Sequence, residues 1–417
     1  MTTLISNIKL LVNTREQHRL LRGKELAHLP CIEDAFLIIE DDHIAEYGSM
    51  KDVKFRVADF TSHYDAKGKI ILPSWCDSHT HLVFAGSREN EFVDKIKGLS
   101  YAEIAAKGGG ILNSAKKLNA TSEDELYKQS YKRLQEVMAL GTGGIEIKSG
   151  YGLSVEGEIK MLRVIQRLKR NSPIPIKATF LGAHTIPVEF KENRQDYIDL
   201  IINEMLPVIA NEKLADYIDV FCEENFFTPE ETELICNAGK AIGLKPKIHA
   251  NQLSVSGGVQ TGVKLGAVSV DHLESMDENA ISSLANSSTV GTLLPTAAFF
   301  LRMPFQPARK LIDNNCAIAL ASDFNPGSSP SGNMNFVVSL SCIQMKMLPE
   351  EAINAATING AYAMELQNEV GSITVGKKAN LIITKEIPSL AYLPYAFGTN
   401  LIDKIVLNGE SIESLSN

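Results

Sequence analysis

The feature that most constrains this chain is a regular alternation of short apolar segments with amphipathic ones between about residues 71 and 321. The apolar segments have the length of strands, and the segments between them have the apolar spacing of helices. The predicted strands lie at about 71–77, 143–148, 174–181, 217–222, 245–249, 267–271, 289–294 and 316–321. Eight strands that alternate with helices favour a (β/α)8 TIM barrel over an open sheet.

Both ends of the chain differ from this central region. Residues 1–70 contain short β-like pieces separated by turn residues, and the chain is β-like again after about residue 370. We therefore expect residues 1–70 and 370–417 to form one small β-sandwich-like domain. It would lie beside a barrel made of residues 71–369.

Composition and charge exclude several classes of partner. The 417 residues carry a net charge of −9 without a long basic run, which argues against nucleic acid and anionic membranes. The first residues lack the pattern of a secretory signal, and no window has the apolar length of a membrane span. The six cysteines are scattered without CxxC pairs, which is typical of reduced thiols. We expect a cytoplasmic protein.

Two histidines, His79 and His81, stand one residue apart where the first predicted strand ends. Residues i and i+2 of a strand share a face, so both imidazoles can converge on one point. Converging neutral imidazoles bind first-row metals strongly. Taken alone, the pair is equally well explained as two surface histidines near a turn.

Further polar side chains follow other predicted strands. His184 follows the third strand, His249 the fifth, His272 the sixth and Asp323 the eighth. Active-site residues of a (β/α)8 barrel come from these carboxyl ends, so coincidence is a poor explanation for the whole set. The predicted ligands of one metal ion are His79, His81, His249 and Asp323. A position left for water would let the metal lower the pKa of that water toward neutrality.

This arrangement resembles the amidohydrolase superfamily over roughly the whole chain. Binuclear members place a metal-bridging lysine on strand 4, but here that strand ends in residues 220–224 without a lysine. Lys148 ends strand 2 instead. The resemblance therefore implies a mononuclear site, for which Zn²⁺ and Fe³⁺ both suit the donor set.

Two branches of this superfamily compete. Mononuclear deaminases carry a His-x-x-Glu motif on strand 5, whose glutamate transfers a proton to a ring nitrogen. This chain has Gln252 in that place after His249. A glutamine neither takes up nor releases a proton at neutral pH, so it favours an orienting role over ring deamination. A deaminase acting on a cyclic amidine is the runner-up.

Other segments resemble the imidazolonepropionase family, the ring-opening hydrolases of histidine degradation. These segments are 81–89, 108–111, 146–153, 179–184 and 322–328. The resemblance implies a homodimeric enzyme that hydrolyses 4-imidazolone-5-propanoate to N-formimino-L-glutamate. The residues that it implies in contact with the anionic substrate or product are Arg88, Tyr151, His184, Gln252, Asn325, Gly327 and Ser328.

The chemistry of these residues suits such a substrate. An arginine fork binds a carboxylate in bidentate geometry, and Tyr151 offers a hydroxyl. The alternative is that Arg88 pairs with a structural acid, Glu89 or Glu91, and that Tyr151 only packs.

In the expected mechanism, a metal-activated water attacks the ring carbonyl carbon. Asp323 is then the base, and His272 stabilises the charge that develops. His184 and Gln252 hold the ring in place.

Two other interpretations concern function and motion. An inactive relative acting as a scaffold would be expected to lose metal ligands, whereas the predicted ligand set is complete.

The glycine segments 108–110 and 141–144 lack the spacing of a phosphate-binding loop. The first of them is a candidate lid over the site.

Overall fold

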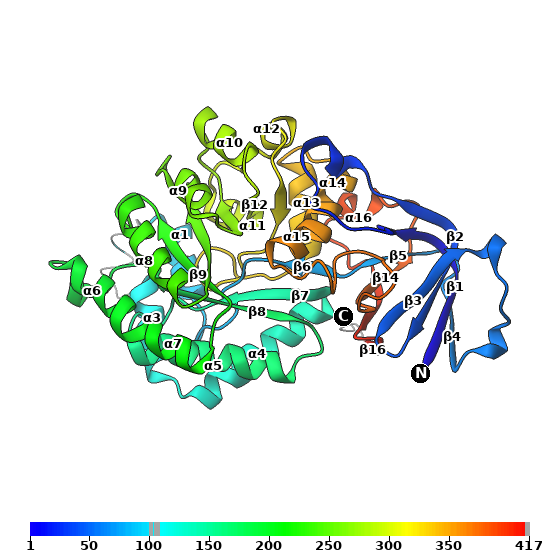
Figure 1. The fold of residues 1–417 in the computed structure, drawn as a ribbon, viewed down its shortest axis with the longest axis horizontal. Helices are drawn as coiled ribbons and strands as arrows, with labels where there is room; N and C mark the ends of the chain where they lie inside the picture. The colour runs from blue at the N-terminus through cyan, green and yellow to red at the C-terminus, as the bar shows by residue number, and fades with distance from the viewer. Residues whose placement is uncertain (100–102, 104–108, 413–417) are drawn as a thin grey trace.

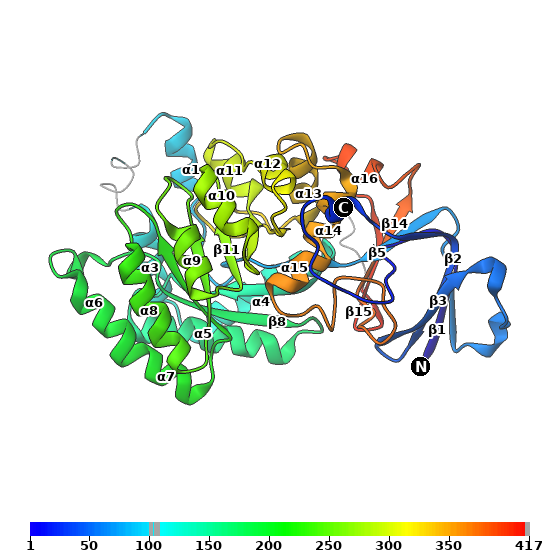
Figure 2. The same cartoon turned by 45° about the horizontal axis from the view of Figure 1, so that its top comes forward.

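The computed structural model describes residues 1–99, 103 and 109–412, and these form two eight-stranded sheets (Figure 1). One sheet is wrapped by helices, and the other lies beside it. Both views place the second sheet at one end of the molecule (Figure 2). Within the described part of the chain, no helix has the length and apolarity needed to span a bilayer.

The helix-wrapped sheet is a parallel barrel, as the sequence predicts. Each strand pairs in parallel with the next along the chain, from the first to the eighth. The ring closes just beyond the first and last strands, where Thr80 and Phe324 form a parallel bridge. The strands are β6 (Trp75–Asp77), β7 (Thr142–Lys148), β8 (Ile176–Ala183), β9 (Tyr217–Cys222), β10 (Lys245–Ala250), β11 (Ser269–His272), β12 (Val290–Leu293) and β13 (Ile318–Leu320).

The helices of the chain have ordinary end signals. For example, the Ser154 side chain accepts from the Gly157 amide at the start of α5, and Lys169 and Arg170 lie in its last turn. The α-helices described are α1 (Glu89–Ile96), α3 (Ile111–Ala120), α4 (Glu123–Ala139), α5 (Val155–Asn171), α6 (Arg194–Leu200), α7 (Leu206–Glu212), α8 (Pro229–Ala241), α9 (Gly258–Leu265), α10 (Glu278–Ala285), α11 (Pro295–Leu301), α12 (Ala308–Asp313), α13 (Met334–Ile343), α14 (Pro349–Ala356), α15 (Ile358–Ala363) and α16 (Tyr392–Tyr395).

The second sheet combines strands from both ends of the chain, again as predicted. Its order is β16-β15-β14-β5-β1-β2-β3, and β4 pairs with β1. Ile5, Leu37, Ile71 and Leu381, from four of its strands, share one apolar cluster. The strands are β1 (Thr2–Val12), β2 (Cys31–Glu40), β3 (His43–Ser49), β4 (Ser62–Asp65), β5 (Lys69–Pro73), β14 (Leu381–Glu386), β15 (Ile402–Leu407) and β16 (Glu410–Ile412).

The single strand predicted at 71–77 is wrong in detail, because it is two strands in different sheets. β5 pairs antiparallel with β14 of the second sheet, and β6 begins the barrel. The change of partner occurs between them, where the Ser74 amide donates to the Asn380 carbonyl and the Trp75 amide to that of Gly141. The chain therefore crosses from one sheet to the other at Pro73 and Ser74.

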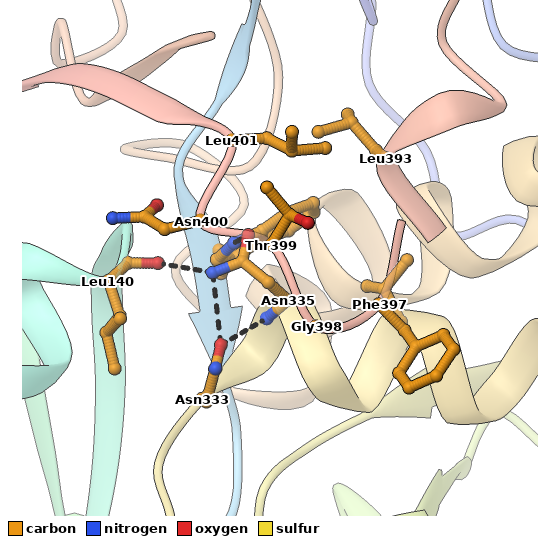
Figure 3. Close-up of a pocket in the computed structure, with 11 residues that line it drawn as sticks. Leu140, Asn333, Asn335, Leu393, Phe397, Gly398, Thr399, Asn400 and Leu401 are labelled. Carbon is orange, nitrogen blue, oxygen red and sulfur yellow. Dashed lines mark hydrogen bonds between the residues drawn. The ribbon is translucent and has the colours of Figure 1, made fainter. Parts of the chain in front are cut away.

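A cavity of about 680 Å³ lies between the barrel and the segment 397–401 (Figure 3). Trp75 Nε1 donates to Asn335 Oδ1 at 3.1 Å, and Asn335 Nδ2 donates to the Leu140 carbonyl at 2.9 Å. Trp75 begins β6 and Leu140 precedes β7. This cavity therefore lies at the amino ends of the strands, opposite the histidines that follow them.

Candidate active site

The candidate site is at the carboxyl ends of the barrel strands, where the ring closes. The His81 amide donates to the Phe324 carbonyl at 2.9 Å, and the Asp323 amide donates to the His79 carbonyl at 3.0 Å. These two bonds join the segment after β6 to the segment after β13. As a result, Asp323 lies beside the two histidines, although about 240 residues separate them in the sequence.

The four predicted metal ligands are brought together. His81 Nε2 lies 3.4 Å from His249 Nε2, and Asp323 Oδ1 lies 3.5 Å from His79 Nε2 and 3.6 Å from His81 Nε2. A second group with metal-ligand spacing contains His79, His272 and Asp323. The buried Nε2 of His79 has no hydrogen-bond partner among the described residues. A converging set of imidazole nitrogens with one carboxylate is suited to a metal ion.

Two buried aspartates orient the histidines. Asp271 Oδ2 lies 2.7 Å from Nδ1 of His79, and Asp219 Oδ2 lies 2.9 Å from Nδ1 of His249. Each Nδ1–H donates to its carboxylate, which leaves the Nε2 lone pair of both rings directed at the common point. Sequence reasoning missed both aspartates.

Lys148 lies between these two aspartates. Its Nζ is 2.8 Å from Asp219 Oδ2, 2.6 Å from Glu146 Oε1 and 3.5 Å from Asp271 Oδ2. Burial alone would lower the pKa of Lys148, but the charges of Asp219, Glu146 and Asp271 outweigh it and raise that pKa. Lys247 also pairs with Glu146. The signal that sequence reasoning left unused is the presence of these charges inside otherwise apolar strands.

The protonation states of the ligands follow from burial. Burial, assisted by neighbouring positive groups, holds the pKa of His79, His81 and His249 well below its usual value. These rings are therefore neutral at pH 7, as metal binding requires. Burial also raises the pKa of Asp323 to about 6. For His272, burial lowers the pKa, but the charge of Glu274 outweighs it, and the net shift is upward.

A small cavity opens above the ligands and encloses about 290 Å³. Phe221, which sequence reasoning did not select, contributes to its wall together with residues predicted for the site. Those predicted residues are His81, Tyr151, His184, His249, Gln252, His272, Asp323, Asn325 and Ser328. His79, Arg88 and Gly327 lie outside this lining.

His184 is fixed on one wall of the cavity. Its Nδ1 lies 2.9 Å from the Gly150 carbonyl, and its ring stacks on that of His81 with centroids 5.2 Å apart. Gly150 has φ +109°, and a Cβ there would lie 2.9 Å from His184 Nδ1. Burial lowers the pKa of His184 to about 4, so the ring is neutral with Nδ1 protonated toward Gly150. Tyr151 packs edge-on against both histidines.

Asn325 organises the loop that follows Asp323. Its Oδ1 accepts from the amides of Gly327 and Ser328, both at 2.8 Å, and its Nδ2 donates to the Asp323 carbonyl at 2.7 Å. Ser328 Oγ donates to Asp323 Oδ2 at 3.0 Å. The loop thus fixes one oxygen of the predicted base and leaves Oδ1 facing the histidines.

Gln252 is carried by the loop after β10, which a buried glutamate holds. Glu223 Oε2 accepts from the Leu253 amide at 2.8 Å, and Glu223 also pairs with the Ser254 hydroxyl. Glu223 directly follows β9, the fourth barrel strand, which has no lysine at its end. This end of the strand therefore supports the loop that carries Gln252. Gln252 lines the cavity next to the ligands.

Arg88 lies in an adjoining cavity of about 1030 Å³, beyond the loop of Asn325 and Gly327. Its Nε and Nη2 donate to Glu91 Oε2 at 2.9 and 2.6 Å. Of the two interpretations of Arg88, the structure displays the ion pair with a nearby acid. Its Nη1 nevertheless reaches the site loop, because a Cβ on Gly327 would lie 2.4 Å from it. For the predicted lid, Gly108 lies outside the described residues.

Known proteins with closely similar sequences share one name. Imidazolonepropionases of Flavobacterium johnsoniae and Christiangramia forsetii are 60% and 58% identical to this chain, over 99% of it and 100% of each relative. The chain belongs to the imidazolonepropionase family. The imidazolonepropionase of Alkaliphilus oremlandii is 41% identical over 99% of the chain and 98% of its own length. The model of the amidohydrolase family matches residues 229–412.

Solved structures outside the imidazolonepropionase family share the fold. A triazine hydrolase variant covers 100% of this chain with 96% of its own, at a TM-score of 0.74 and 14% identity. The guanine deaminase of E. coli covers 99% of this chain with 99% of its own, at a TM-score of 0.73 and 13% identity. At such low identity these matches establish the barrel with its flanking sheet and nothing more.

Proposed function

We propose that this protein hydrolyses 4-imidazolone-5-propanoate to N-formimino-L-glutamate with the help of one metal ion. The observation that carries the proposal is the convergence of His79, His81, His249 and Asp323 beneath a cavity whose walls hold Gln252. Membership of the imidazolonepropionase family supports the substrate, since relatives at 58–60% identity carry that name over their whole length.

The residues present fit a resident metal ion. The donor set has three imidazole nitrogens and one carboxylate oxygen, and the buried His79 Nε2 has no other partner among the described residues. Zn²⁺ and Fe³⁺ both suit such donors. The second ligand group shares His79 with the first, and the aspartates below are paired with Lys148, which supports a single ion. When bound, the ion supplies a water of lowered pKa.

Asp323 moves the proton in the proposed reaction. Its Oδ2 is held by Ser328, whereas Oδ1 faces His79 and His81. Burial raises the pKa of Asp323 to about 6 in the metal-free protein, and a bound cation would lower it, so the carboxylate would be ionised and able to accept a proton. We assign to it the acceptance of the proton of the attacking water and its transfer to the departing ring nitrogen.

The remaining residues bind and orient the substrate. His272 faces the same point as Asp323 and would donate a hydrogen bond to the oxygen that gains charge at the carbonyl carbon. His184 presents Nε2, because Nδ1 is committed to Gly150, and Gln252 offers both a donor and an acceptor to the ring. Arg88, which reaches the loop at Gly327, is the group proposed to bind the propionate.

A paired assay tests this function. One arm follows the loss of imidazolone propionate absorbance, and the other follows ammonia release from cytosine, guanine and related rings, both on protein of known metal content. Metal-dependent ring opening without ammonia supports the proposal. Ammonia release without imidazolone turnover would assign the protein to the deaminases and refute the interpretation of Gln252.

Two expectations about the protein in the cell stay predictions. A homodimer is expected, and light scattering on the purified protein measures it directly. A cytoplasmic location is also expected, and cell fractionation with a cytoplasmic marker tests it.

A further inference from the structure

Glu91, in α1, connects Arg88 to the backbone at Gly110 beside the candidate site. Its Oε2 accepts from Nε and Nη2 of Arg88, and its Oε1 accepts from the Gly110 amide at 3.0 Å. The side chains of Glu91 and Arg88 are each only 12% exposed, so the ion pair is mostly shielded from solvent. A shielded, charge-assisted pair fixes geometry much more firmly than a surface pair does.

The pair uses one particular edge of the guanidinium. An arginine has five N–H donors, arranged along an Nε/Nη2 edge and an Nη1/Nη2 edge. Glu91 takes the Nε/Nη2 edge. Nη1 then lies against Gly327, where a Cβ would lie 2.4 Å away from it, and Gly327 is followed by Ser328 of the ligand cavity. Nη1, the nitrogen that Glu91 does not use, is thus the one placed beside the site loop.

From this geometry we infer that Glu91 is a positioning residue that sets the preference for carboxylate-bearing substrates. It acts through Arg88: it holds the Nε/Nη2 edge so that Nη1 stays beside Gly327. Glu91 is therefore not displaced when substrate binds, and it does not compete with the substrate for Arg88. This inference deepens the proposed function, and it rests on Arg88 binding the propionate.

Steady-state kinetics of the Glu91→Gln variant test the inference. The substitution keeps the size of the side chain but removes the charge that holds Arg88. We expect KM for imidazolone propionate to rise about tenfold, the scale of a weakened charge-assisted hydrogen bond, with kcat changed less than about twofold. Turnover of an imidazolone ring that lacks the carboxylate should not change. Glu89→Gln is the matched control, because the exposed Glu89 bonds to Ser87 rather than to Arg88.

Every other outcome overturns the inference in a different way. A lower KM would show that Glu91 competes with the substrate carboxylate. An equal loss on the ring without a carboxylate, or the same change in the Glu89 variant, would show a general effect on folding. In the Arg88→Ala background, Glu91→Gln should have no further effect on KM, and an additive effect would refute an action through Arg88.

A crystal structure of the Glu91→Gln variant separates this inference from the proposed function. If Glu91 positions Arg88, the guanidinium should leave its place against Gly327 even without substrate. If Arg88 stays there, the positioning role fails whatever the substrate is. If Arg88 moves but wild-type protein does not turn over imidazolone propionate, the positioning role stands and the proposed function fails.

Discussion

Replacing Lys148 by methionine tests whether the buried charges beneath the ligands support the fold. The variant has an apolar side chain of similar length, and among the described residues it leaves Glu146, Asp219 and Asp271 with only Lys247 as a counter-charge. The Lys148 side chain and its three partners are wholly buried. Breaking one side of a buried ion pair typically costs about 3–5 kcal/mol. This is a large part of the roughly 5–15 kcal/mol that stabilises a native protein.

The single tryptophan makes this loss measurable. Trp75 is buried at the start of the first barrel strand, so its fluorescence reports the barrel during urea denaturation of metal-free protein. The control is Lys264→Met, which removes an exposed lysine paired with Glu233 and should cost no more than about 1 kcal/mol. If both variants lower the midpoint equally, the buried network contributes no special stability and the reasoning is wrong.

The pH dependence of the stability of the Lys148→Met variant is an independent test of the same explanation. Without the ammonium, the neighbouring carboxylates repel each other, and their folded-state pKa values should rise above the unfolded values. At these carboxylates the folded variant then binds more protons than the unfolded chain, so its loss of stability relative to wild type should shrink as the pH falls from 7 toward 5. A deficit relative to wild type that grows on acidification would contradict this explanation.

Three further predictions concern the site itself. Asp323→Asn should lower kcat by at least about a thousandfold, and high turnover with unchanged metal content would exclude Asp323 as the base. Gly327→Ala places a methyl group 2.4 Å from Arg88 Nη1, so KM for the propionate substrate should rise about tenfold while stability changes by less than about 1 kcal/mol, and an unchanged KM would separate Arg88 from the substrate. His184 has a folded pKa of about 4, below the usual unfolded value, so its stabilisation is complete above about pH 6.5 and is lost as the pH falls toward 4. Between pH 7 and pH 5, the free energy of unfolding of metal-free His184→Gln, measured by urea denaturation, should therefore fall by about 2 kcal/mol less than that of wild type. Equal decreases in the two proteins would refute the assigned pKa.

The sequence predicted the barrel and the convergence of the polar side chains that follow its strands, because both depend on local patterns. Strand length, helical spacing and the position of a polar residue at a strand end are all visible within about ten residues. His79, His249 and Asp323 could therefore be selected from the sequence alone, and the structure brings them together. The break at Ser74 was missed although Pro73 and Ser74 interrupt the apolar run, because the change of hydrogen-bond partners that follows involves distant residues.

The supporting residues were missed because their partners are distant in sequence. Lys148 meets Asp219 and Asp271 only when the barrel strands are assembled, and no local pattern pairs them. A charged residue in an apolar barrel strand is nevertheless a usable signal. Glu146 and Lys148 are two residues apart, so they share a face of the strand, and both side chains are buried. Arg88 is the opposite case, because its partner Glu91 is only three residues away and could be named from the sequence.

The barrel closes at Thr80 and Phe324, so the proposed metal centre lies where its first and last strands meet. The ligands contributed by the first strand and by the last come together only after about 240 residues have folded between them. Closing a loop of that length costs about 5 kcal/mol in chain entropy, which the intervening strands must offset. Assembly of the site is therefore coupled to completion of the ring. An ion held by His79, His81 and Asp323 would tie the two ends of the barrel sheet to each other. The contacts between the ion and these ligands would then serve the reaction and also slow the unfolding of the barrel.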